Sequence, residues 1–79
     1  NIEDLLIQDQ IETDIKKLIN QLPEDQKEVI LLRHYGELSF KEIAEQTNVS
    51  INTALGRMRY ALINLRKLIE KHDISLTVR

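Results

Sequence analysis

Residues 39–53 read SFKEIAEQTNVSINT, and this stretch decides the fold because it encodes its own helix boundaries. Ser39 is followed three residues later by Glu42, which is the spacing of a capping box. In that motif the hydroxyl accepts a hydrogen bond from the third helical amide, while the carboxylate accepts one from the amide of the capping residue. The stretch therefore predicts a short helix from Phe40 to about Gln46.

A turn and a second helix follow directly. Asn48 tolerates the left-handed backbone conformation with which helices end, and Ser50 is a favoured capping residue for the next helix. Val49 between them is predicted to plug the space between the helices, and the small side chain of Ala44 allows the helices to cross closely. Together these features are typical of a helix-turn-helix.

The second helix of the motif is predicted to be long, from about Ile51 to Lys71. Its apolar residues repeat at helical spacing and form one stripe: Ala54, Met58, Ala61, Leu65 and Leu68, widened on one side by Leu55, Leu62 and Ile69. The same helix carries five basic residues and one acidic residue, a net charge of +4. Such a helix can enter the major groove of DNA with its N-terminal half leading.

Composition indicates a single all-α domain, and the pattern along the chain predicts four helices in it. The chain has 79 residues with two glycines, one proline and no cysteine, which excludes disulfides and thiolate metal sites. The segments are a first amphipathic helix (1–21), a second helix (22–37), the helix-turn-helix (38–71) and a tail (72–79). Because the chain begins at Asn1 rather than methionine, we expect it to be a piece of a longer protein.

The net charge of −2 hides a strong asymmetry along the chain. Residues 1–32 carry a net charge of −5, residues 33–49 carry −1 and residues 50–79 carry +4. Because phosphates repel the acidic half, any nucleic acid is expected to meet the other end. The absence of a signal peptide and of an apolar run of about 18 residues favours a cytoplasmic protein without a membrane span.

Four consecutive apolar residues, Val29 to Leu32, stand in the predicted second helix. On a helix such a run points in nearly all directions. Either the helix is deeply buried, or part of its surface receives a protein partner. In the second case the candidate partner-binding residues are Val29, Ile30 and Leu31.

The sequence offers no support for an enzyme or for a cofactor. It has no glycine-rich phosphate loop and no nucleophile accompanied by a base and an orienting group. Ser39 and Ser50 are accounted for as helix caps. His34 and His72 are well separated and have no cysteine to join them, so no metal site is expected.

Four segments, in this order and spacing, resemble one family: Leu22–Arg33, Leu38–Ala44, Val49–Thr53 and Arg57–Leu62. Over residues 11–71 the chain resembles region 4, the C-terminal DNA-reading domain of bacterial RNA polymerase sigma factors, and is nearest to the extracytoplasmic-function group. The resemblance implies recognition of the minus-35 promoter element and contact with the β flap of the RNA polymerase core. It also implies an anti-sigma factor as a further partner, and a preceding region 2 module that melts the minus-10 element.

By position, the resemblance implies specific DNA contacts. Groove-facing roles fall on Asn52, Thr53, Leu55, Gly56, Arg59 and Tyr60. Phosphate contacts fall near Arg33, Lys41, Ser50 and Arg57. Alternatives stay open for two of these residues, because Arg57 is equally suited to an ion pair with an acid such as Glu28 or Glu42, and Tyr60 to packing on the domain surface.

Three positions depart from the family pattern. Many relatives have Lys or Arg where Leu55 stands, Ser where Gly56 stands and Arg where Tyr60 stands. Arg59 is then the main guanidinium left to read bases. A leucine can touch a thymine methyl group but cannot read guanine. We therefore expect the isolated domain to bind DNA weakly.

Two other functions fit the same sequence. One is a stand-alone helix-turn-helix regulator of transcription, which would usually dimerise to read two half-sites one helical turn apart. The other is a protein-interaction module, in which the Val29–Leu32 surface and the long helix bind protein, for example an anti-sigma factor.

Overall fold

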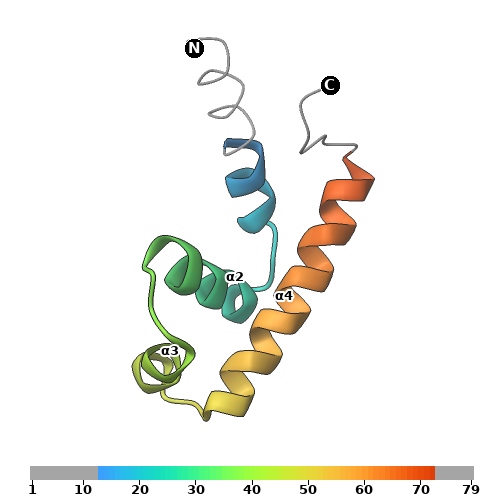
Figure 1. The fold of residues 1–79 in the computed structure, drawn as a ribbon. Coiled ribbons are helices and arrows are strands. Elements are labelled where there is room, and N and C mark those ends of the chain that lie inside the picture. Colours follow the sequence, from blue (N-terminus) through green and yellow to red (C-terminus); the bar gives the residue numbers. More distant parts are fainter. Residues whose placement is uncertain (1–12, 73–79) are drawn as a thin grey trace.

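The computed structural model describes residues 13–72, and every regular element in that range is a helix. The first helix is described over residues 13–19 and is followed by α2 (Glu24–Ile30), which continues as a π-helix, η1 (Leu31–Tyr35). Then come α3 (Phe40–Thr47) and α4 (Ile51–Lys71). α4 runs along one side of the molecule, with α3 beside its beginning (Figure 1). The prediction of an all-α, four-helix fold is confirmed.

The first helix and α2 are joined by a turn at Leu22 and Pro23. Pro23 stands just before the first helical residue of α2, and its carbonyl accepts a hydrogen bond from Lys27 N at 2.9 Å. Glu24 and Asp25 fill the first turn of α2, where acids interact favourably with the positive end of the helix dipole. The predicted helical turns before residue 13 and the predicted tail after residue 72 lie outside the described residues.

The second helix, predicted within residues 22–37, is an α-helix only over Glu24–Ile30. Its last turn widens into the π-helix η1, in which the amide of Gly36 donates to the carbonyl of Leu31, five residues back, at 3.0 Å. A Cβ atom at Gly36 would lie 2.7 Å from the carbonyl oxygen of Leu32. Gly36 is therefore required for the space it leaves, since its own φ of −82° is open to any residue.

The helix-turn-helix forms with the predicted caps. Ser39 Oγ accepts from Glu42 N at 3.1 Å, and Glu42 Oε1 accepts from Ser39 N at 3.1 Å. Asn48 adopts the left-handed conformation, with φ 58° and ψ 46°, and ends α3 one residue later than predicted. Ser50 Oγ accepts from Thr53 N at 3.1 Å, and α4 has the predicted bounds.

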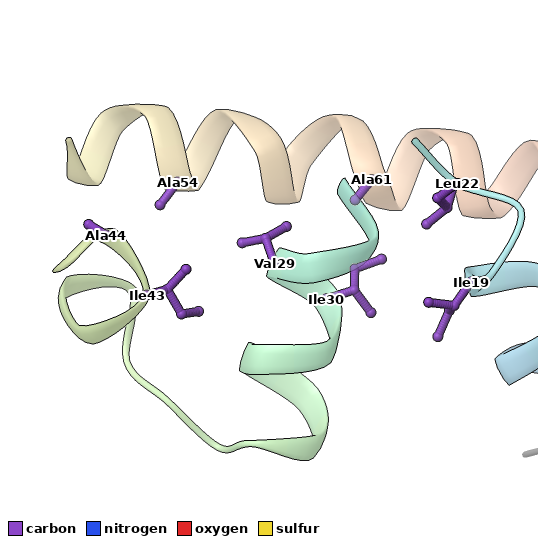
Figure 2. Close-up of a cluster of buried hydrophobic side chains, with 8 residues drawn as sticks. All are labelled: Ile19, Leu22, Val29, Ile30, Ile43, Ala44, Ala54 and Ala61. Atoms are coloured by element: carbon purple, nitrogen blue, oxygen red, sulfur yellow. The ribbon is translucent and has the colours of Figure 1, made fainter. Parts of the chain in front are cut away.

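The core is a row of aliphatic side chains between α4 and the other helices (Figure 2). From α4 come two fully buried alanines, Ala54 and Ala61, whose small side chains let its backbone approach the row closely. Val29 and Ile43 are the largest fully buried side chains, and burial of each is worth about 1.5–3 kcal/mol. The whole cluster comprises Ile19, Leu22, Val29, Ile30, Ile43, Ala44, Ala54 and Ala61.

The predicted apolar stripe of α4 is confirmed at its centre and at the partly buried Ile69, but it is wrong for the other two residues of its edge. Three central residues pack, partly buried, against the core: Met58, Leu65 and Leu68. In contrast, Leu55 and Leu62 are 43% and 51% exposed. The physical reason is that α2 lies against the opposite flank of α4, where Asn64 Nδ2 donates to Gln26 Oε1 at 2.8 Å.

Candidate nucleic-acid interface

The outward surface of α4 begins with two parallel ridges of side chains, because residues four apart follow one another along a helix surface. The first ridge consists of Ile51, Leu55 and Arg59, and the second of Asn52, Gly56 and Tyr60. We call these six residues the leading face. Gly56 is partly buried and leaves a gap in the second ridge, while the other five are exposed. Within the described residues, this face is therefore accessible to solvent.

The side chains of Ser50 and Thr53 form the cap of α4. Besides accepting from the amide of Thr53, Ser50 Oγ donates to Thr53 Oγ1 at 3.0 Å. Both residues are exposed at the positive end of the helix dipole, where amides of the first turn point outward. A helix end of this kind suits a phosphate group. The cap therefore places both predicted DNA-contacting residues where a backbone phosphate could reach them.

Arg57 forms an intramolecular ion pair with an acid that differs from the expected ones. Its Nε lies 3.7 Å from Asp25 Oδ2 in the first turn of α2, so the alternative of an intramolecular ion pair is confirmed, with Asp25 rather than Glu28 or Glu42 as the acid. Arg57 lies on the flank of α4 that faces α2, which decides the partner. The side chains of Arg57 and Asp25 are 30% and 52% exposed, so the ion pair contributes at most about 1 kcal/mol to the free energy of unfolding.

Arg33 contacts the loop before α3 and the first residue of that helix. Its Nη1 donates to the carbonyl of Leu38 at 2.9 Å, and its guanidinium carbon lies 5.4 Å from the centre of the Phe40 ring. These contacts join the end of η1 to the start of α3 and so help to fix the helix-turn-helix on the second helix. Lys41, the other predicted phosphate contact near this position, is exposed in the first turn of α3.

The capping box also sets the charge near Lys41. Hydrogen bonds from the backbone and then from the side chain of Ser39 lower the pKa of the Glu42 carboxyl below its ordinary value of 4.5. Glu42 therefore stays ionised into mildly acidic solution. Its negative charge moderates the positive potential at the start of α3, so the stronger basic surface belongs to α4.

Two of the three predicted partner-binding residues are inaccessible. Val29 and Ile30 are 2% and 3% exposed in the core, so no protein can contact them while the domain stays folded, and the prediction is wrong for both. The run of apolar residues is thus explained mainly by burial. Leu31 is only partly buried and lines an open hollow, here called the Leu31 hollow, together with Lys16, Asn20 and Tyr35.

Ile51 belongs to the leading face although the sequence did not indicate it. It is 46% exposed and is the first helical residue after the Ser50 cap. Its position directly after the cap could have predicted this exposure, because a residue at the tip of a helix has no preceding turn to cover it.

The rest of the described surface carries little further chemistry. Arg66 Nε lies 3.5 Å from Glu70 Oε1, but both side chains are mostly exposed and the pair adds little stability. Among residues 13–72, no group of three or more His, Asp or Glu side chains could hold a metal ion. In the same range, no helix combines the length and the apolar character that crossing a membrane requires.

Comparisons with known proteins show which family the chain belongs to. Residues 12–62 match the family model described as Sigma-70, region 4. The chain is also similar to RNA polymerase sigma factor SigV of Bacillus subtilis (strain 168), with 36% identity over 64 residues. That alignment covers 81% of this chain and 39% of SigV, so the chain spans about two fifths of this relative. The match extends over most of the helical core, and the chain belongs to the sigma-70 region 4 family.

Proposed function

We propose that this domain binds the minus-35 element of a promoter and so helps to direct RNA polymerase to start transcription. The N-terminal half of α4 lies in the major groove, where Asn52, Arg59 and Tyr60 contact base edges. The observation that carries this proposal is the open leading face on a helix with a net charge of +4. Family membership supports the same role.

The contacts to the DNA backbone come from the edges of this face. Ser50 and the amides at the start of α4 hold one phosphate, and Arg57 holds another in competition with its ion pair to Asp25. Lys41 and Arg33 lie on the α3 side. These contacts position the domain, while the leading face supplies the sequence preference.

A salt titration tests this function. The dissociation constant of the chain for a promoter duplex is expected to rise steeply with salt, because phosphate neutralisation releases counterions. Arg59→Ala should cost about 1–3 kcal/mol and relax the preference at one base pair. Arg66→Ala is the matched control, since it removes an arginine from the same helix two turns beyond the leading face.

Two results of these titrations would contradict the proposed function. Binding that ignores salt, or that survives Arg57→Ala combined with Arg59→Ala unchanged, would overturn the proposal. Circular dichroism of each variant must show intact helices before the titrations are compared.

We further propose that the Leu31 hollow is the contact surface for a protein partner, either the β flap of the polymerase core or an anti-sigma factor. The hollow lies between the first helix and η1, so a partner seated there leaves the leading face of α4 free. Leu31→Asp is expected to abolish co-purification with polymerase core while the helices remain intact. Leu62→Asp places the same charge on an exposed leucine of α4 and should retain the partner.

A stand-alone regulator is the less favoured function, because the family match points to a part of a sigma factor. Light scattering separates the two, since a regulator would dimerise on a palindromic site. A role at promoters places the domain in the bacterial cytoplasm and requires neither a catalytic group nor a cofactor.

A further inference from the structure

The tip of the leading face is apolar, although it belongs to a basic helix. Ile51 and Leu55 stand four residues apart at the start of the first ridge and are both exposed. Side chains of a helix lean towards its N-terminus, so these two project towards whatever the tip of α4 meets. Neither donates nor accepts a hydrogen bond, and neither can read guanine, cytosine or adenine through polar groups.

One feature of the major groove is apolar, namely the C5 methyl group of thymine. We propose that Ile51 and Leu55 form a thymine-reading patch, which gives this domain a preference for a thymine-containing step at the leading end of its site. This inference rests on the proposed function and names the sequence class that the leading face selects.

The surroundings of the patch fit a groove better than a protein partner. Arg59 continues the same ridge, and Ser50 with the amides at the start of α4 lies beside Ile51, so the patch is bordered by groups suited to bases and phosphates. Beside Leu55, the gap at Gly56 has nothing within 4 Å of where a Cβ would stand. A base edge can therefore approach the helix backbone next to the leucine.

The spacing of the patch sets the spacing of the thymines. Side chains four residues apart on a helix are about 5–6 Å apart. Successive bases on one strand are about 3.4 Å apart. Ile51 and Leu55 are therefore expected to read two thymines that are adjacent or separated by one base.

The test replaces thymine by deoxyuridine, which keeps the base pairing and lacks only the methyl group. A binding site is first selected with this chain from randomised duplexes at low salt, and each thymine is then replaced in turn. At two positions the wild-type chain should bind about fourfold more weakly, the ratio that corresponds to about 0.8 kcal/mol for one buried methyl group. Leu55→Ala should lose the response at one of these positions and Ile51→Ala the response at the other.

Leu62→Ala is the matched control, because Leu62 is an exposed leucine on the same side of α4 beyond the leading face. It should keep the full response to deoxyuridine. Salt-dependent binding without any response to deoxyuridine would overturn the thymine-reading patch and leave the proposed function intact. A chain that fails to select any duplex at low salt would overturn both.

Discussion

Arg57 Nε of α4 lies 3.7 Å from Asp25 Oδ2 of α2, so an acid of the second helix holds a basic residue at the edge of the leading face. The pair connects the acidic half of the chain to the basic helix. It also means that a predicted phosphate contact has an intramolecular competitor.

Asp25→Asn should therefore strengthen DNA binding by up to about fivefold, the ratio that corresponds to about 1 kcal/mol for an exposed ion pair. The change frees the Arg57 guanidinium for phosphate and removes a nearby negative charge. Fluorescence anisotropy with a labelled promoter duplex measures the effect. Glu24→Gln makes the same charge change in the same turn without touching the pair, and equal gains from both variants would show a general charge effect instead.

The two glycines should respond to alanine in opposite directions. Gly56→Ala adds a methyl group into open space in the middle of α4 and should raise the free energy of unfolding by about 1 kcal/mol, the difference in helix propensity. In a domain of this size that corresponds to a rise in melting temperature of about 4–8 °C. Gly36→Ala should destabilise the domain, since its Cβ would lie 2.7 Å from the Leu32 carbonyl oxygen. Thermal unfolding followed by circular dichroism compares the two, and a stabilising Gly36→Ala would show that η1 relaxes easily.

Acid should weaken the start of α3 through Glu42. The pKa of its carboxyl is lowered in the folded state, so its stabilising contribution is complete above the ordinary value of 4.5 and is lost as the pH falls through the folded value. Ser39→Ala should lower the free energy of unfolding at neutral pH by about 1 kcal/mol. It should also raise the Glu42 pKa only part of the way to 4.5, because the stronger hydrogen bond, from the backbone of Ser39, remains.

Carboxyl NMR titration of Glu42 measures this shift. Ser50→Ala is the control, because it removes the cap of α4 and leaves the capping box of α3 in place. An unchanged Glu42 pKa in Ser39→Ala would show that the serine hydroxyl contributes nothing to the lowered value.

Neighbouring residues of the second helix should differ sharply in their tolerance of charge. Ile30→Asp buries a carboxylate in the core and is expected to unfold the domain, and even Ile30→Ala should cost about 2–5 kcal/mol. Leu31→Asp should leave the helices intact, because Leu31 is only partly buried at the edge of an open hollow. Far-ultraviolet circular dichroism distinguishes the two outcomes, and loss of helix in Leu31→Asp would remove that variant as a probe of partner binding.

The helix-turn-helix was predictable from sequence because its boundaries depend on contacts within four residues. The capping box of Ser39 and Glu42, the left-handed Asn48 and the Ser50 cap all act locally, so they appear where the sequence placed them. The periodicity of α4 likewise predicted its buried centre and the exposure of Arg59 and Tyr60.

Only the tertiary structure decided how the helices meet, because those contacts depend on the angle at which α2 crosses α4. That crossing gives Arg57 the partner Asp25, leaves Leu55 and Leu62 exposed, and buries Val29 and Ile30. A helical wheel gives the direction of a side chain around its own axis, but not which flank a neighbouring helix covers. The sequence thus determined the helices and their caps, while the packing of distant segments determined which residues remain free to meet DNA.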